Sequence, residues 1–493
     1  MHTLLCGGMT RGVVFDSLLG LGCDSVSDTL AQPECRDVVH GMVVGKLQGS
    51  APRQRGAALL EGMVTRASVC VRRLGGGRRS QQVRFGRLLD NSKVTIERLI
   101  EGWSQQTGPA AVGRHVLAIQ DTSEINFRTS SERRRGLGEI GKGVGRGVLV
   151  HAMLALDAEQ GSCLGLVAGR IWTRPGRVTV THDKRALEDK ESERWVSTGM
   201  AAKTVLADAR TVTIIGDRES DFYAAWAMLP SPNFHLISRV MNDRCLSDGS
   251  SLYAASERFP RADTRSVALR ARAPHAPARA AGLSLRFGTV TLRRPKGPMQ
   301  RHLPESVSLT LVEVIERNPP NGAEPLHWRL LTTHDVPDVA AAWRIIDWYK
   351  QRWNIEQLWR IMKLQGLRIE DSQLATAERL IKLTAIAAKA AAIIFQLHQA
   401  RDSGSAEPAT VAFPDHEIAV LDALNTRVEG KTMLQKNPHP KNSLPWASWV
   451  IARLGGWDGY PSSRPPGPIT YKYGLEHFRV ILIGWSLKDV CMP

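Results

Sequence analysis

The order of apolar segments between residues 115 and 240 is the feature that most constrains the fold. Three strand-like segments come first, and a helix, a strand, a helix and a strand then alternate; they read HVLAIQDTSEINF, VLVHAMLALD, CLGLVAGRIWTR, ALEDKESERWVSTGMAAKTVLAD, TVTIIGD, FYAAWAML and FHLISRV. β-Branched residues and alternation mark the strands, and the helical segments are amphipathic. This order predicts a mixed α/β sheet covered by helices on both faces.

The flanking segments predict further domains, because 493 residues are too many for one compact core. Residues 1–112 are expected to form a basic helical module, although the first ~50 residues carry little periodic signal. Residues 113–400 would hold the α/β sheet, interrupted over about 240–340 by alternating, antiparallel-type strands. The apolar helix IKLTAIAAKAAAIIFQLHQ should pack against the sheet, and residues 401–493 should be helical.

Charge and cysteine content narrow the functional class. The formal net charge is +17, with Lys and Arg spread along the whole chain, which favours a polyanionic partner such as nucleic acid. The alternative is a basic proteome or a ribosome-adjacent protein. Seven cysteines without a C-x-x-C pair indicate reduced thiols, no zinc site and a cytoplasmic protein. No uninterrupted apolar run approaches the ~18 residues that cross a bilayer, so we expect no membrane partner.

Two aspartates each follow a strand-like run. Asp121 follows the segment VLAI, and Asp217 follows the segment TIIG. Ligands collect at the carboxyl ends of strands in open α/β sheets, and two neighbouring carboxylates repel unless a cation lies between them. Mg²⁺ would satisfy such a pair, since it prefers oxygen ligands. The alternative for either residue alone is an aspartate that starts a turn or caps a helix.

The segment Asp347–Lys363 predicts one helix with a charged stripe. Tyr349, Arg352, Glu356 and Lys363 lie at offsets of 0, 3, 7 and 14, within roughly 60° around a helix. Glu356 would be a third metal ligand, and two carboxylate-bound metals can activate water and stabilise a leaving oxygen. The side chains of Arg352 and Lys363 would then bind the flanking phosphates.

The alternative for this helix is a solvated surface with Arg/Glu pairs, each worth a few tenths of a kcal/mol. The tryptophans between the charges argue against a simply solvated face; they are Trp348, Trp353 and Trp359.

The motifs together carry a family resemblance. The spacing Y-x2-R-x3-E-x6-K, an upstream Asp-Thr after a strand, and G-D-R-E-x-D after another strand resemble bacterial DDE transposases of the insertion-sequence family with the Tyr-Arg-Glu-Lys signature. The resemblance runs from about Val83 to Trp485. It includes the blocks DNSKVT, EDKESERW, LISR, PLHWRLLTT and WASWVIARLGG. The first ~50 residues do not match the family's usual start.

The resemblance implies an RNase H-like catalytic domain in which Asp121, Asp217 and Glu356 bind two Mg²⁺ ions, with Mn²⁺ as an alternative. It also implies an N-terminal domain that reads the element's terminal inverted repeats, and a C-terminal dimerisation domain. Such enzymes cut double-stranded DNA at the element ends, form and reopen a DNA hairpin, and join the end to target DNA. The expected assembly is a homodimer on DNA, in the bacterial cytoplasm and associated with the nucleoid.

The resemblance also assigns DNA contacts. Trp328 matches an aromatic residue that stacks on a flipped base during hairpin formation. This stacking offsets part of the free energy that unstacking the base costs. Arg239 matches a residue near the DNA end, and the signature residues Tyr349, Arg352 and Lys363 are expected to contact DNA. Without the resemblance, Trp328 is equally well explained as a core residue of a β-hairpin. Two other functions stay open: a catalytically inactive or domesticated DNA-binding copy, and a related RNase H-like endonuclease.

Overall fold

The structure is a computed structural model, and the following description covers the residues that it places. These are residues 43–127, 136–141, 145–174, 190–269, 278–297, 300–320, 322, 324–401, 407–460 and 462–488. Contacts divide the chain into Met1–Val39 and His40–Pro493, so every described residue belongs to the second unit. The expectations for the first ~50 residues fall largely outside the described residues.

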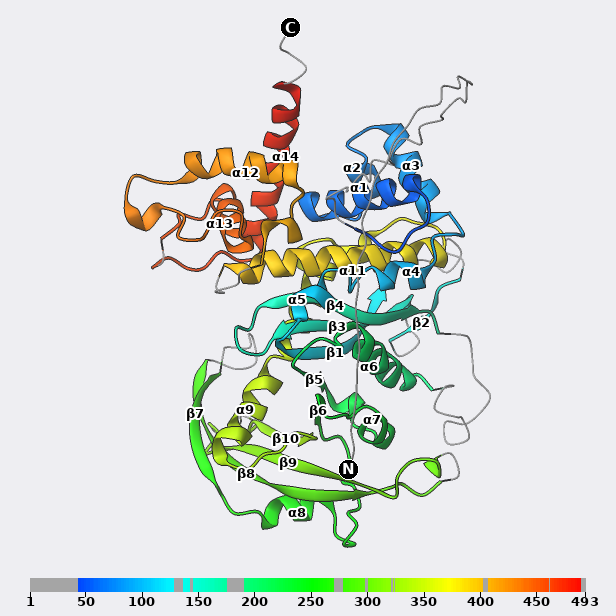
Figure 1. The fold of residues 1–493 in the computed structure, drawn as a ribbon, viewed down its shortest axis with the longest axis vertical. Coiled ribbons are helices and arrows are strands. Elements are labelled where there is room, and N and C mark those ends of the chain that lie inside the picture. The colour runs from blue at the N-terminus through cyan, green and yellow to red at the C-terminus, as the bar shows by residue number, and fades with distance from the viewer. Residues whose placement is uncertain are drawn as a thin grey trace, which may run out of the picture. The chain divides into compact units, whose positions relative to one another are not determined.

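Within this part of the chain, ten strands form one sheet with the order β2-β3-β1-β5-β6-β10-β9-β8-β7, and β4 also pairs with β3 (Figure 1). The strands are β1 His115–Asn126, β2 Gly138–Ile140, β3 Gly145–Asp157, β4 Cys163–Trp172, β5 Thr211–Gly216, β6 Phe234–Arg239, β7 Asp263–Leu269, β8 Arg279–Arg293, β9 Ser306–Arg317 and β10 His327–Thr332. The predicted mixed α/β sheet is therefore confirmed.

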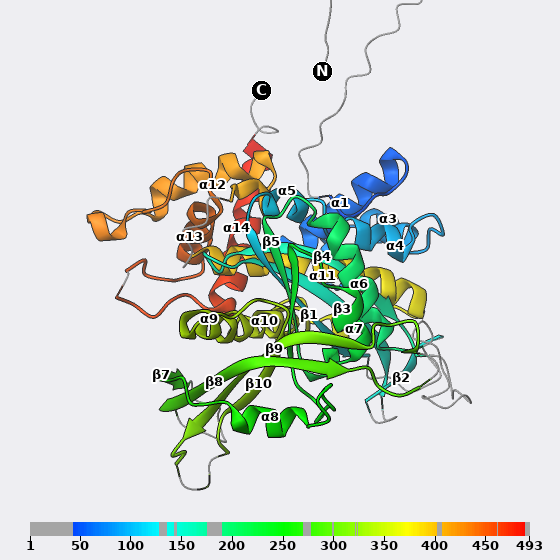
Figure 2. The ribbon, with the colours of Figure 1, turned by 60° about the horizontal axis from the view of Figure 1, so that its bottom comes forward.

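Strand direction changes along the sheet. β1, β5 and β6 are parallel, whereas β3 is antiparallel to β1 and β4 to β3. β10 pairs antiparallel with β6, placing Leu330 opposite Arg239, so the strands of the β-rich insertion extend the same sheet. Figure 2 shows β8, β9 and β10 as one curved layer, with the short helix α8 (Leu252–Arg258) against it.

Alternation along β1 separates two cores. Val116 and Ala118 face a cluster that includes residues of α6 (Glu193–Val205) and α7 (Tyr223–Met228). Leu117 and Ile119 face the opposite cluster, which includes α11 (Ala377–Ala400). Because successive side chains of a strand point to opposite faces, this pattern requires helices on both sides of the sheet.

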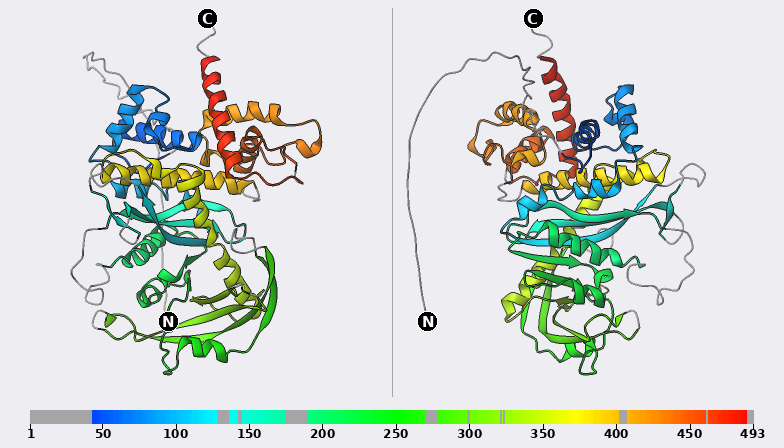
Figure 3. Two further views of the ribbon diagram at one scale, coloured as in Figure 1. Left: turned by 180° about the vertical axis from the view of Figure 1, so that it is seen from behind. Right: turned by 45° about the vertical axis from the view of Figure 1, so that its right-hand side comes forward.

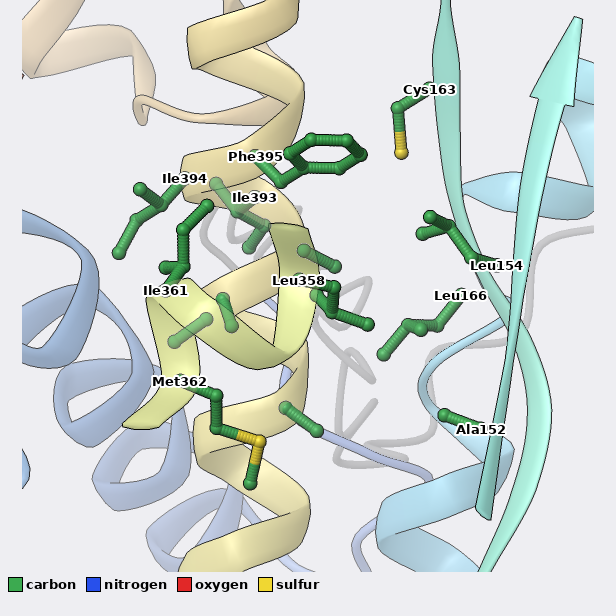
Figure 4. Close-up of a cluster of buried hydrophobic side chains, with 14 of the residues drawn as sticks. Ala152, Leu154, Cys163, Leu166, Leu358, Ile361, Met362, Ile393, Ile394 and Phe395 are labelled. Carbon is green, nitrogen blue, oxygen red and sulfur yellow. The ribbon is translucent and has the colours of Figure 1, made fainter. Parts of the chain in front are cut away.

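Helix α11 is the central helix of the larger core. It packs against β4, as predicted, and Figure 4 shows Phe395 of α11 and Leu358 facing Leu154, Cys163 and Leu166 of the sheet. An 18-residue window of α11 has a mean hydropathy of 1.7, so this helix is long and apolar enough to cross a membrane by length and composition alone, although lysines interrupt its apolar run. That window is 94% buried inside the protein, which identifies α11 as a core helix.

The remaining helices lie at the two ends of the chain and after the insertion. They are α1 Ser50–Arg66, α2 Val71–Leu74, α3 Arg79–Leu89, α4 Ile96–Glu101, α5 Thr107–Ala111, α9 Val339–Lys350, α10 Trp353–Arg360, α12 Asp415–Val428, α13 Leu444–Leu454 and α14 Pro468–Lys488. Short helical turns are η2 Arg218–Ser220, η4 Ile361–Gln365, η5 Ile369–Asp371, η6 Ala409–Val411 and η7 Met433–Gln435. Helix α1 contacts both α11 and α14, and Figure 3 shows the helices of both chain ends on the α11 side of the sheet.

The single helix predicted over Asp347–Lys363 is wrong in one respect, because the structure divides it into α9, α10 and the π-helix η4. At the first junction the N–H groups of Gln351 and Arg352 bond to the carbonyls three residues earlier, of Trp348 and Tyr349. These i−3 bonds tighten the helix at the junction, and the π-turn then shifts the side chains that follow it around the axis.

Candidate active site

The parallel register of β1 and β5 brings the two predicted aspartates to the same level of the sheet. Ile119 lies opposite Ile215, two residues before Asp121 and Asp217, respectively. Asp217 directly follows β5, as predicted, and its Oδ1 accepts a hydrogen bond of 2.9 Å from the N–H of Glu219.

Asp121 differs from its predicted place at a strand end. It lies inside β1, which runs on to Asn126 because its pairing with β3 continues, with Asp121 opposite Ala152. The pairing with β5 ends at Ile119, however, so Asp121 still lies just beyond the last parallel pair.

The carboxyl of Asp121 is the most perturbed acid of this region. Its Oδ2 accepts a 3.0 Å hydrogen bond from Trp359 Nε1. Burial first, and then the negative charge of Asp217 and that of Glu356, raise its pKa to about 7, against the opposing effects of Trp359 and Arg352. The three predicted acids are therefore electrostatic neighbours.

Glu356 reaches this region from the first turn of α10. Its Oε1 lies 3.4 Å from Arg352 Nη1, the i,i+4 ion pair that the sequence allows. The Arg352 side chain is largely buried whereas that of Glu356 is partly exposed, so the pair is more than a solvated surface bridge.

The aromatic residues predicted to contact DNA also meet. Trp328 on β10 and Tyr349 on α9 pack edge to face, with ring centroids 5.3 Å apart. Burial raises the pKa of Tyr349, while the charges of Arg352 and Arg239 oppose that rise. Arg239 ends β6 and donates to the carbonyl of His327 at 3.0 Å.

Lys363 lies on the π-helix η4. Burial lowers its pKa, and four acids oppose that change, Glu370 most and Asp121 among them. All eight predicted site residues thus gather in one region, although they come from β1, the end of β5, β6, β10, α9, the α9–α10 junction, α10 and η4.

These three acids suit a metal ion by their chemistry but not by their arrangement in this structure. Within the described part of the chain, no group of three or more His, Cys, Asp or Glu side chains is arranged to hold one. Asp121, Asp217 and Glu356 each face a protein donor instead, namely Trp359, the N–H of Glu219 and Arg352. The donor chemistry nonetheless fits, because an all-carboxylate set suits a hard divalent cation.

The sequence did not identify three neighbours of this region as site residues. Trp359 comes one turn after Glu356, so its i+3 spacing was the available signal. Arg218 directly follows Asp217 and influences both Tyr349 and Arg239 electrostatically. Arg194 of α6 bonds to Thr122, the residue after Asp121; it lies in the block EDKESERW of the family resemblance, but that block gave it no role.

Comparison with known proteins adds little. No family model matches the chain. Among solved structures, the chain is similar to a piggyBac transposase in a synaptic complex with hairpin DNA, with a TM-score of 0.36 and 11% sequence identity over 90% of this chain and 73% of the other. Similarity at this level does not define a shared fold, so the function of this chain has to be inferred from its own residues.

Proposed function

We propose that this chain is a DNA transposase that moves an insertion sequence by a cut-and-paste route, through phosphodiester hydrolysis, a DNA hairpin and strand transfer. The observation that carries the proposal is the gathering of Asp121, Asp217 and Glu356 around one perturbed carboxyl, whose pKa is about 7. Perturbed groups of this kind concentrate at functional sites. The sequence resemblance to DDE transposases and the strand order β4-β3-β1-β5-β6, which is consistent with an RNase H-like core, support it.

The three acids would hold two Mg²⁺ ions, or Mn²⁺ in their place. When bound, such ions activate a water and stabilise the leaving oxygen of the phosphodiester. The chain's own residues would orient the DNA: Arg352 and Lys363 would bind phosphates on either side of the scissile bond.

The pair Trp328 and Tyr349 would receive the DNA end. A base turned out of the duplex would stack on Trp328, whose ring is held at its edge by Tyr349. Arg239, fixed by the carbonyl of His327, would lie close enough to contact the same DNA end.

The helices near the start of the described chain would bind double-stranded DNA at the terminal inverted repeats. Their exposed basic side chains are Arg72, Arg73, Arg78, Arg79, Arg84 and Arg87. Such a cluster is an electrostatic footprint for phosphates. A DNA-bridged homodimer formed through residues 401–493, and a place in the bacterial cytoplasm, complete the proposal.

The decisive experiment uses a supercoiled plasmid that carries the genomic flanks of the gene, Mg²⁺, and the Asp217→Asn variant. We expect wild type to nick the element ends, and D217N to lose nicking by at least ~10³-fold while its DNA affinity is kept. The matched control is Asp208→Asn, since Asp208 is an exposed aspartate at the opposite end of β5 and should be silent.

The other outcomes separate the competing functions. Nicking by D217N at correctly identified ends would refute the assignment of the three acids. Metal-dependent nicking by wild type without joining to target DNA would favour the endonuclease. Binding without any metal-dependent product would favour the inactive copy.

A further inference from the structure

Arg194 is a buried arginine that the proposed chemistry does not use. It lies in the first turn of α6 with a side chain only 8% exposed, and its guanidinium stacks 5.4 Å from the Trp195 ring and 5.9 Å from the Trp172 ring. A buried cation is retained only where its donors are satisfied. Its partners therefore show what it does.

Two of its three hydrogen-bond partners belong to the chain segments that carry the aspartates, and the third is the carbonyl of Glu191, which accepts from Nη1 at 2.6 Å. Nε donates to Thr122 Oγ1 at 2.8 Å, and Nη2 donates to Glu219 Oε2 at 2.6 Å. Thr122 directly follows Asp121. Glu219 lies two residues after Asp217 and donates its N–H to the Asp217 carboxylate at 2.9 Å. One guanidinium thus joins the end of β5 to the middle of β1.

Thr122 is also hydrogen-bonded to a buried histidine, which links it to Gln120. Its Oγ1 lies 2.8 Å from His151 Nδ1, and His151 Nε2 lies 3.2 Å from Gln120 Oε1. Full burial lowers the pKa of His151 well below its usual value, so the ring is neutral. The donors then follow one direction: Arg194 to Thr122, Thr122 to Nδ1, and Nε2–H to Gln120.

This network lies on the far side of the strand from the carboxylate. Alternation along β1 points Gln120 and Thr122 towards α6, whereas Asp121 points towards α10 and Trp359. Both neighbours of Asp121 are therefore held by hydrogen bonds on the α6 side of the strand.

We propose that Arg194 is a positioning residue that sets the placement of Asp121 relative to Asp217, through Thr122 and Glu219. The inference rests on the proposed function, because it concerns the same acids. Outer-shell partners of metal ligands typically change affinity or activity 10–100-fold when removed. Small displacements of catalytic groups have effects of similar size.

The test compares Arg194→Met, Arg194→Lys and Glu219→Gln with wild type. We expect R194M to lower kcat for nicking by about 10–100-fold with the Kd for DNA unchanged, and R194K to recover part of the loss because one donor and the charge remain. Glu219→Gln should lower kcat less, and the R194M/E219Q double variant should be no worse than R194M alone.

The matched control is Arg170→Met. Arg170 stacks on the same Trp172 ring at 5.5 Å and pairs with Glu193 of the same helix at 3.1 Å, but it is half exposed and touches neither aspartate segment. Its replacement should leave nicking unchanged. A loss in R170M equal to that in R194M would overturn the proposal, because it would reflect α6 packing alone.

A second readout separates this inference from the proposed function. Mn²⁺ binding, measured by electron paramagnetic resonance of the free ion, should weaken by about 10-fold or more in R194M and E219Q, with or without DNA. If wild type binds Mn²⁺ but never nicks, the proposed function fails while the positioning role is still measured. Should R194M fail to fold, a folded E219Q with wild-type kcat and Mn²⁺ affinity would overturn the proposal.

Discussion

Glu417 is predicted to make the stability of this protein depend on pH near neutrality. It lies in the first turn of α12, and its side chain is fully buried. Neither carboxylate oxygen has a hydrogen-bond partner within the described part of the chain. Burial, and then the charge of Glu61, raise its pKa from 4.5 to about 8, and Arg479 opposes the rise only in part.

The sign follows from linkage. The folded state binds the proton of Glu417 more tightly than the unfolded chain does. The stability that protonated Glu417 contributes is therefore fully present below pH 4.5 and is lost as the pH rises towards 8. A pH of 7 lies about 2.5 units above 4.5, the pKa of this carboxyl in the unfolded chain. At 1.36 kcal/mol per unit the loss is about 3 kcal/mol.

The variant Glu417→Gln removes the ionisation and keeps the shape. Urea unfolding of the full chain, followed by tryptophan fluorescence, should show E417Q more stable than wild type by about 3 kcal/mol at pH 7 and by less than about 1 kcal/mol at pH 5. The control is Asp422→Asn on the same helix. Asp422 is an exposed partner of Lys441, so its removal should change stability by less than about 1 kcal/mol at either pH.

Parallel stability curves for wild type and E417Q between pH 5 and pH 8 would refute the reasoning. They would mean that Glu417 ionises in the folded protein at its ordinary pKa, either through water or by pairing with Arg479.

Three further predictions concern the core, the site and the DNA. Lys389 is buried in α11, where its pKa is lowered to about 8 and it donates to the carbonyl of Gly102. Between pH 7.5 and 9.5, the free energy of unfolding of wild type should therefore rise by about 2 kcal/mol relative to that of Lys389→Met in the same assay. The absence of such a rise would contradict the lowered pKa. Trp359→Phe removes the hydrogen-bond donor to Asp121 and keeps an aromatic ring. Nicking should then need about 10-fold more Mg²⁺, with the affinity for DNA unchanged. An unaltered Mg²⁺ titration would show that this hydrogen bond is dispensable. DNA binding should weaken by roughly 10³-fold or more between 50 and 200 mM salt if about six phosphates are contacted, whereas salt-independent binding would exclude a backbone-binding protein.

Much of the fold was predictable because it depends on local periodicity. The apolar alternation of β1 and the composition of α11 can be read without knowing what they contact. The candidate acids were predictable for the same reason, since Asp121 and Asp217 come just after apolar runs. The break between α9 and α10 was not predictable, because Gln351 and Arg352 are not helix-breaking residue types and the break arises from i−3 hydrogen bonds.

The sequence by itself determined the strands, the helices, the positive charge and the identity of the candidate acids. Only the tertiary structure decided that Ile119 pairs with Ile215, and therefore that Asp121 and Asp217 share one level of the sheet. It also decided that Arg194 bonds to Thr122 and that Glu417 is buried without a partner. The reason is physical: periodicity is local, whereas register, burial and hydrogen-bond partners are set by contacts between segments far apart along the chain.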